Sequence, residues 1–428
     1  MKYHLAIDIG ASSGRHIVGR RENGEMKTTE VFRFPNGMIR KNGSLVWDME
    51  ALVDRVREGI DRAKAEFGGI DSLAVDAWGA DYVLLYGRES ARTCFAYRDG
   101  RGERAARLLH EKTDRRELYM RTGCQYQPFN TVYQLYDDLL AGRLEGATDF
   151  LMIPEYILYR LCGSREKEYT NATTTGLIGA DSGKFDAELT GALGLPERLF
   201  GELGLPGKTV GEYEGIRCLL CATHDTASAV EGIPMRGSEL YISSGTWSLL
   251  GAKTERCIIS ETGMRGNWSN EGGAGYNRFQ KNIMGMWIIN GLHERLCPDV
   301  PLPELINAAE ESGYDETLDA NAPELFSPED MKAAFDSLLS SPPPDPAGYI
   351  RCACRSLALS YAEAIKELEN ETGVSYHELY IVGGGAKNGF LNRLAQQASG
   401  KRVMALPIEA SALGNLKIQA EAETHDTI

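Results

Sequence analysis

The 428-residue sequence lacks several features that would place it in a large class of proteins. It has no apolar run near the roughly 20 residues that a membrane-spanning helix needs, and residues 1–4 lead into a predicted strand instead of a signal segment. Basic residues are few, because 46 Lys and Arg face 61 Asp and Glu and leave a net charge of −15. Such a chain repels nucleic-acid phosphates and anionic membranes. We therefore expect a cytoplasmic protein that binds no nucleic acid and no membrane, with no obligate protein partner.

Cysteine follows neither a disulfide pattern nor a metal pattern. The nine cysteines are an odd number scattered over a long chain, unlike the dense, even spacing of a secreted disulfide scaffold. The pairs Cys218/Cys221 and Cys352/Cys354 invite a zinc interpretation, but neither has a second Cys or His pair at zinc-finger spacing. The P-loop motif is also missing. If the chain binds ATP, another phosphate-binding loop must hold the nucleotide.

The composition is that of a folded protein, with 43% hydrophobic and 25% charged residues. At about 150 residues per domain, its length predicts two or three domains. A pattern of strand, small-residue turn and strand occurs at residues 3–20 and again at residues 239–251. Strands alternate with helices in both halves, which predicts an α/β fold. A Gly/Pro interruption at residues 232–234 indicates a boundary, so we expect one domain at residues 1–232 and a second at residues 233–428.

Several further elements follow from apolar spacing. A strand is predicted over residues 218–223, with the first turn of a helix after it, and residues 281–287 are interpreted as the polar entry into an apolar helix. Other helices are predicted over residues 50–66, 150–161, 345–370 and 388–399.

Three Gly-rich turns are candidate phosphate or nucleotide loops. Residues 8–15 read Asp-Ile-Gly-Ala-Ser-Ser-Gly-Arg, whose N–H groups and hydroxyls suit a phosphate, while Arg15 supplies charge and Asp8 can hold a hydrated Mg²⁺. Residues 243–248 form an equivalent turn in the second half, and the three glycines at 383–385 permit close approach of a base or ribose. Each turn taken alone is more often a plain turn than a binding loop. Their order across a duplicated fold favours nucleotide binding.

Acidic groups after strand ends are the candidate reacting residues. His224 and Asp225 lie between a strand and a helix, where α/β proteins place reactive groups, although Asp225 is also a good helix cap. Residues 76–81 place Trp78 between two carboxylates, an arrangement that suits a sugar ring, or else a core Trp beside a surface turn. Asn282 is a hydrogen-bonding candidate or a plain N-cap.

In this order, these motifs resemble the FGGY family of carbohydrate kinases, in the branch that acts on L-rhamnulose. The resemblance spans residues 8 to 415. It is carried by residues 8–15, 76–81, 169–175, 224–228, 243–248, 281–285 and 382–385.

The resemblance implies two actin-like (ribonuclease-H-like) ATPase domains with a cleft between them, the sugar mainly on the first and ATP mainly on the second. The implied reaction transfers the ATP γ-phosphoryl group to O1 of L-rhamnulose in L-rhamnose catabolism, giving L-rhamnulose 1-phosphate and ADP with Mg²⁺. Two alternatives remain: an FGGY kinase for another ketose, such as fuculose or xylulose, and an actin-like ATPase that is not a kinase.

Site residues follow position by position, together with the candidates named above. The resemblance makes Asp225 the general base, and Asp8 is the candidate metal ligand. The expected sugar contacts are Trp78, Gly79, Asp81, His224, Asp225, Thr226 and Asn282. The expected ATP contacts are Ala11, Ser12, Ser13, Gly14, Arg15, Thr246, Asn290 and Gly384. Asn290 departs from the family pattern, which carries the longer Gln there.

Overall fold

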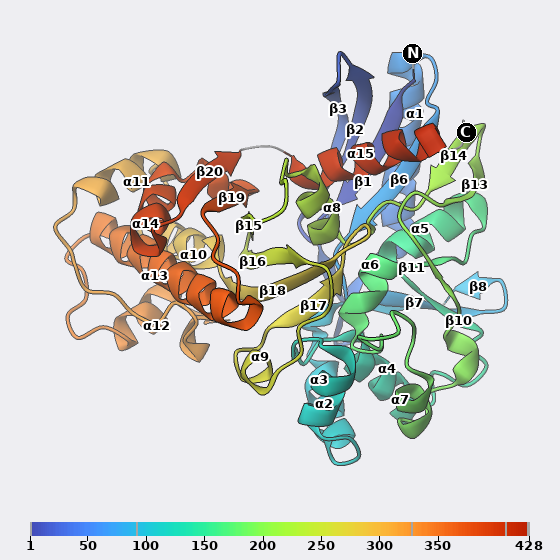
Figure 1. Ribbon diagram of the computed structural model, residues 1–428, viewed down its shortest axis with the longest axis horizontal. Helices are drawn as coiled ribbons and strands as arrows, with labels where there is room; N and C mark the ends of the chain where they lie inside the picture. Colours follow the sequence, from blue (N-terminus) through green and yellow to red (C-terminus); the bar gives the residue numbers. More distant parts are fainter. Residues whose placement is uncertain (1, 91–92, 327, 407–408, 426–428) are drawn as a thin grey trace. The chain divides into compact units, whose positions relative to one another are not determined.

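The computed structural model describes residues 2–90, 93–326, 328–406 and 409–425 (Figure 1). Its chain divides into two compact units, which are described separately. Unit 1 contains the residues up to 232, residues 255–278 and the residues from 410 on; unit 2 contains residues 233–254 and 279–409. The first long segment of unit 1 thus ends at residue 232, and two segments from the second half of the chain pack with it.

Unit 1 is built on a mixed six-stranded sheet of order β13-β14-β6-β1-β2-β3. Strands β1 and β2 form an antiparallel hairpin, whereas β6 runs parallel to β1 and places Asp76 beside Asp8. The six strands are β1 (His4–Ile9), β2 (Ser13–Glu22), β3 (Glu25–Pro35), β6 (Ser72–Ala77), β13 (Thr209–Tyr213) and β14 (Ile216–Leu219).

Unit 1 also contains helices and short strands outside this sheet. The helices of unit 1 are α1 (Met49–Phe67), α2 (Arg101–His110), α3 (Arg115–Thr122), α4 (Thr131–Leu140), α5 (Ile153–Cys162), α6 (Tyr169–Ala172), α7 (Ala187–Ala192), α8 (Asp225–Gly232), α9 (Glu261–Arg265) and α15 (Ala410–His425). The short strands are β4 (Met38–Lys41), β5 (Ser44–Trp47), β7 (Tyr82–Tyr86), β8 (Glu89–Ser90), β9 (Cys94–Phe95), β10 (Asp149–Met152), β11 (Lys167–Glu168), β12 (Leu203–Gly204) and β17 (Ser269–Gly272).

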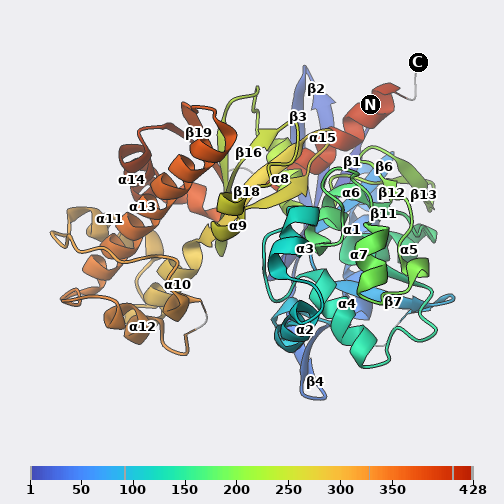
Figure 2. The ribbon, with the colours of Figure 1, turned by 60° about the horizontal axis from the view of Figure 1, so that its bottom comes forward.

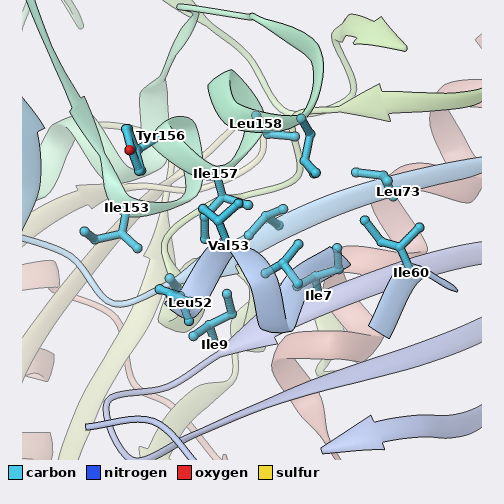
Figure 3. Packing of buried hydrophobic residues seen from close by; sticks show 14 of the residues in the cluster. Ile7, Ile9, Leu52, Val53, Ile60, Leu73, Ile153, Tyr156, Ile157 and Leu158 are labelled. Atoms are coloured by element: carbon cyan, nitrogen blue, oxygen red, sulfur yellow. The ribbon is translucent and has the colours of Figure 1, made fainter. Parts of the chain in front are cut away.

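The main core of unit 1 lies where α1 and α5 cover the central strands (Figure 3). Helix α1 forms here because its apolar residues recur on one stripe, Asp48 caps its first turn by accepting a hydrogen bond from Ala51 N, and Gly68 ends it at a φ of 72°. Burial of each large apolar side chain contributes about 1.5–3 kcal/mol. The residues labelled in the figure are Ile7, Ile9, Leu52, Val53, Ile60, Leu73, Ile153, Tyr156, Ile157 and Leu158.

Unit 2 repeats the plan of unit 1. Its strands lie in the order β18-β16-β15-β19-β20, with β15 antiparallel to β16 and parallel to β19, as β1 is to β2 and β6. Helix α13 packs beside α11 and α14 (Figure 2). The elements are β15 (Leu240–Ser244), β16 (Trp247–Thr254), β18 (Asn277–Met284, whose first two residues belong to unit 1), β19 (Glu378–Val382), β20 (Arg402–Leu406), α10 (Met286–Leu296), α11 (Leu302–Glu311), α12 (Met331–Ser337), α13 (Pro346–Thr372) and α14 (Gly389–Ser399).

The structure confirms the helices predicted at residues 50–66, 345–370 and 388–399. Two predictions were wrong in part. The stretch 150–161 begins with strand β10 before α5 starts, and residues 281–284 end strand β18, so that Asn282 lies on a strand and is no helix cap. Among the described residues, none of the helices combines the length and apolar character needed to cross a membrane.

Candidate active site

Two buried carboxylates lie side by side near the carboxyl ends of β1 and β6. Asp8 and Asp76 are paired in register and are 2% and 0% exposed. Asp76 Oδ2 accepts a hydrogen bond from Asn415 Nδ2 at 2.7 Å, while its Oδ1 is buried without a hydrogen-bond partner among the described residues. Burial, and then the negative charge of Asp8, raise the pKa of Asp76 well above its usual range. The pair therefore forms a site that favours a cation or a proton.

Asp225 lies next to this pair in unit 1. Ala77, at the end of β6, donates its N–H to Thr223 O at 2.9 Å and forms a single β-bridge with His224. The carbonyl of His224 accepts the Ser228 N–H, so His224 occupies the cap position and Asp225 is the first residue of α8. The Asp225 side chain is 30% exposed and accepts a hydrogen bond from Thr226 Oγ1 at 3.1 Å. It therefore remains accessible to a ligand.

Glu168 fixes the backbone just before Asp225 in the sequence. The sequence patterns did not identify this residue. This fully buried carboxylate accepts hydrogen bonds from the N–H and the hydroxyl of Thr223, at 3.1 and 2.8 Å, and from the N–H of Thr170 at 2.8 Å. Burial raises its pKa. Glu168 belongs to no periodic apolar pattern, and its partner Thr223 lies 55 residues away in the sequence. The one local signal that could have pointed to it is its position directly before the motif at residues 169–175.

Asp81 is fully buried and does not reach the surface of the site. Its Oδ2 accepts the indole N–H groups of Trp47 and Trp78 at 2.7 and 3.0 Å, and its Oδ1 accepts Gln134 Nε2 at 3.0 Å. Burial raises the pKa of this carboxyl, and the four donors, Tyr97 N included, lower it. With 0% exposure, Asp81 orients Trp78; direct contact with a sugar would require it to leave these partners. Contact of Asp81 with the sugar stays a prediction.

The loop that contains Trp78 and Gly79 is closely packed. Trp78 is 7% exposed, and the centroid of its ring lies 4.3 Å from that of Trp47, as in the alternative of a core Trp. A Cβ on Gly79 would approach Thr174 Oγ1 to 2.9 Å. Gly79 is partly exposed and is thus the accessible part of this loop.

The turn between β1 and β2, the predicted phosphate loop, is closed by hydrogen bonds. Gly10 N donates to Ser13 O, and Asn36 closes the turn by donating its N–H to Ser12 O and its Nδ2 to Gly10 O. A Cβ at Gly14 would lie 2.1 Å from the Phe34 ring, so any larger residue there would displace that ring. Arg15 Nε bonds Asp8 Oδ2 at 3.0 Å, and Ala11, Ser12 and Ser13 are partly or fully exposed.

Unit 2 gathers the predicted nucleotide residues around the turn from β15 to β16. A Cβ at Gly385 would lie 2.0 Å from Ser244 Oγ, and Met286 N, at the start of α10, donates to Gly245 O. Thr246, Gly384 and Asn290 are exposed. Gly385 and Met286 therefore bring the elements that carry Gly384 and Asn290 to the turn that contains Thr246.

Asn282 lies in unit 2 on β18, and its amide Oδ1 is buried without a hydrogen-bond partner among the described residues. The predicted residues thus form two groups. Unit 1 holds Asp8, Ala11–Arg15, Trp78, Gly79, Asp81, His224, Asp225 and Thr226, and unit 2 holds Thr246, Asn282, Asn290 and Gly384.

The described residues form no disulfide bond and no ready-made cluster of metal ligands. All nine cysteines are free thiols. Within the described ranges, no group of three or more His, Cys, Asp or Glu side chains is arranged to hold a metal ion.

This chain belongs to the FGGY family of carbohydrate kinases: the N-terminal domain of the family is recognised in residues 3–216 and its C-terminal domain in residues 240–423. It is therefore an ATP-dependent carbohydrate kinase. Within the family it is similar to rhamnulokinases. That of Halalkalibacterium halodurans is 36% identical over an alignment of 438 positions, which covers 98% of this chain and 93% of that protein. That of Bacillus subtilis is 37% identical over 435 positions, covering 97% and 89%.

Solved structures agree on the fold. The xylulose kinase of Lactobacillus acidophilus matches with a TM-score of 0.84 at 15% identity, over 99% of this chain and 90% of that one. The Plasmodium falciparum glycerol kinase with ADP matches with a TM-score of 0.79 at 14% identity, over the same shares. FGGY kinases have the actin-like fold, which confirms the expected fold class of two α/β domains.

Proposed function

We propose that this chain transfers the γ-phosphoryl group of ATP to O1 of L-rhamnulose, in the cytoplasm, as a step of L-rhamnose catabolism. The sugar is supported by the similarity to rhamnulokinases over nearly the whole chain. The chemistry rests on one observation: the partly exposed Asp225 carboxylate is fixed at the start of α8, next to the strand ends that carry Asp8 and Asp76.

Asp225 acts as the general base in this proposal. A primary alcohol is a poor nucleophile at neutral pH, and a carboxylate within hydrogen-bond reach orients it and accepts its proton as the phosphoryl group transfers. Gly79, His224, Thr226 and Asn282 bind the sugar, with Trp78 beside it and Asp81 holding that indole in place.

The nucleotide is held by the two sets of loops. Backbone N–H groups and hydroxyls of Ala11–Gly14, with the guanidinium of Arg15, bind phosphate oxygens. Thr246, Gly384 and Asn290 contact the rest of the nucleotide, and the shorter side chain of Asn290 reaches it through a water molecule.

Mg²⁺ fits the acidic pair of unit 1. Asp76 carries a buried Oδ1 without a partner among the described residues, and Asp8 adds a second carboxylate beside it. Mg²⁺ typically uses one or two carboxylates together with phosphate oxygens and water, so no larger cluster is needed. Asp8 would hold the ion or its water, and the ion supplies charge neutralisation on the transferred phosphate.

The variant Asp225→Asn tests the base. The Asn side chain keeps the size and loses the basic oxygen, so we expect turnover to fall by roughly 10²–10⁴ while melting temperature and sugar affinity stay near native. Asp61→Asn, an exposed position on α1, is the control. Near-native turnover in a folded Asp225→Asn protein would remove this assignment.

A substrate panel tests the sugar. ADP release is measured with L-rhamnulose, L-fuculose, D-xylulose and L-rhamnose. We expect the highest kcat/KM with L-rhamnulose; a higher value with fuculose or xylulose would assign the chain to another ketose.

A further inference from the structure

A buried cluster of three charged or titratable side chains in unit 1 consists of His224, Glu271 and Arg278. Arg278, the second residue of β18, is 0% exposed. Its Nε donates to Gly272 O at 2.9 Å, and its Nη2 lies 3.2 Å from both Glu271 Oε2 and His224 Nδ1. A buried cation is stable only with such partners. The place of Arg278 is therefore fixed by its surroundings.

The contact between Arg278 and His224 determines which ring nitrogen carries the proton. A guanidinium can only donate hydrogen bonds and does not lose its proton in proteins. The Nδ1 atom that faces it must therefore accept, which leaves the proton of a neutral imidazole on Nε2. Glu271 Oε2 lies 3.4 Å from the same Nδ1 and would favour the opposite tautomer. Arg278 Nη2 lies closer to Nδ1, at 3.2 Å, than Glu271 Oε2 does, at 3.4 Å. The guanidinium also neutralises the charge of the Glu271 carboxylate.

The other ring nitrogen faces the proposed base. His224 Nε2 lies 3.6 Å from Asp225 Oδ1. An Nε2–H donor next to a carboxylate acceptor can form hydrogen bonds with two ligand oxygens at once when those oxygens lie on neighbouring carbons. In the proposed reaction, Asp225 would accept the hydrogen bond of the O1 hydroxyl, and His224 would donate to the oxygen on C2.

We infer that Arg278 is a positioning residue that holds His224 as the Nε2–H tautomer, so that the site selects substrates with an oxygen on the carbon next to the phosphorylated one. The tautomer follows from unit 1 alone, whereas the selectivity rests on the proposed function. A site built to bond an oxygen rejects an analogue without it, because a buried donor is then left unpaired.

The first experiment measures the tautomer in the unliganded wild-type protein. Histidine is labelled with ¹⁵N, and the His224 signals are assigned by their loss in His224→Gln. We expect a protonated Nε2 and an unprotonated Nδ1 near neutral pH. A proton on Nδ1, or on both nitrogens, would overturn the inference. Because no substrate is present, this result is independent of the proposed function.

The second experiment removes the donor. In Arg278→Met, Glu271 is left as the partner of Nδ1, so we expect the Nδ1–H tautomer, whereas Arg278→Lys should keep Nε2–H. Arg217→Met, a partly buried arginine of the same unit that pairs with Glu423, is the control and should change nothing at His224. An unchanged tautomer in folded Arg278→Met overturns the inference. If that variant does not fold, the wild-type spectrum and Arg278→Lys decide.

The third experiment compares L-rhamnulose with an analogue that carries two hydrogens in place of the C2 oxygen. We expect wild-type kcat/KM to favour L-rhamnulose by roughly 10²–10⁴, and Arg278→Met to lose most of that preference with little change in the KM for ATP. An equal preference in both proteins contradicts the selectivity. Absence of any phosphorylation of L-rhamnulose by the wild-type protein would instead contradict the proposed function and leave the tautomer result intact.

Discussion

At the scale of single residues, unit 1 buries titratable side chains in two different ways. Asp81 forms no ion pair with any described residue and is stabilised by four hydrogen-bond donors. His16, on β2, is fully buried beside the rings of Phe32 and Phe34; its Nε2 donates to Val56 O at 3.1 Å and its Nδ1 has no partner among the described residues. The first arrangement supports a charged group, whereas the second supports only a neutral ring.

His16 makes unit 1 sensitive to acid. Burial lowers its pKa to about 4, below the 6.5 of an exposed imidazole. The unfolded chain therefore binds the proton first, and the stability from a neutral His16 is complete above pH 6.5 and is lost as the pH falls toward 4. Between pH 7 and 5 we expect a loss of about 2 kcal/mol in the free energy of unfolding.

Urea unfolding at pH 7 and pH 5 measures this loss. The control is His16→Gln, whose amide can still donate to Val56 O but does not titrate in this range. We expect the pH difference to shrink by about 2 kcal/mol in the variant; an equal difference in both proteins would assign the acid sensitivity to other groups.

Asn282 provides a test of sugar binding. Its Oδ1 is buried without a partner among the described residues, so a donating sugar hydroxyl would satisfy it. Loss of such a bond is typically worth 1–3 kcal/mol, which predicts that Asn282→Ala raises the KM for the sugar by about 10- to 100-fold and the KM for ATP far less. Asn290→Ala is the matched variant, with the opposite pattern expected. A parallel rise in both constants for Asn282→Ala would remove it from the sugar site.

The sequence predicted the positions of the candidate site residues better than it predicted their hydrogen-bond partners. Asp81 follows a strand end, which motif spacing detects, but its partners Trp47 and Gln134 lie 34 and 53 residues away in the sequence. Its burial therefore depends on tertiary packing that no local pattern contains. Glu168 was missed for the same reason, since its main partner is Thr223.

At the scale of elements, glycines let the loops of unit 2 approach each other. Gly383 has a φ of 83°, which glycine adopts readily, and a Cβ there would lie 2.6 Å from Ser244 O. Gly385 leaves no room for a methyl group beside Ser244 Oγ, whereas a Cβ at Gly384 would be 3.9 Å from the nearest atom, Ser244 O. A methyl group therefore fits at position 384, whereas at position 385 it would force Ser244 to move.

This difference predicts opposite outcomes for two alanine substitutions. Gly385→Ala forces Ser244 and the turn that follows to move, so we expect a loss of about 1–3 kcal/mol in stability and weaker ATP binding. Gly384→Ala should keep wild-type stability within about 0.5 kcal/mol. Denaturant unfolding and ATP titration measure both effects. Equal stability of the two variants would show that the loop adapts.

The elements themselves were largely predictable where their apolar period is long. Helices α1 and α13 carry such a period over most of their length, and both were predicted within a few residues. Residues 281–287 failed because a strand end, a glycine and a helix start follow one another within seven residues, too short for any period to show. The stretch before Pro154 failed similarly, because residues 150–152 of β10 are as apolar as the helix after them.

At the scale of the whole molecule, unit 1 is completed by the C-terminal helix. Helix α15 packs on α8, β1 and β6 (Figure 1). Gln419 Nε2 donates to Leu5 O at 3.0 Å, and Asn415 donates to Asp76, so the helix supports both central strands. A Cβ on Gly414 would lie 1.8 Å from Ser228 O, which shows how closely α15 approaches α8.

We therefore predict that a fragment of residues 1–232 does not unfold cooperatively, because one face of its sheet and Asp76 lose their cover. Adding a peptide of residues 409–428 should restore a cooperative urea transition and near-ultraviolet circular dichroism. The control peptide carries Gly414→Leu, whose side chain meets the Ser228 carbonyl, and should restore neither. Cooperative unfolding of the fragment alone would show that α15 is dispensable for the fold.

The return of α15 to β1 also sets an order of events during synthesis on the ribosome. Residues 233–254 and 279–409, which form unit 2, all emerge before the helix that completes unit 1. The sheet of the nascent first unit therefore lacks the cover of α15 while some 180 further residues are translated, at 5–20 residues per second. During this interval of roughly 10–40 s, its uncovered strands are a binding site for chaperones and a target for proteases.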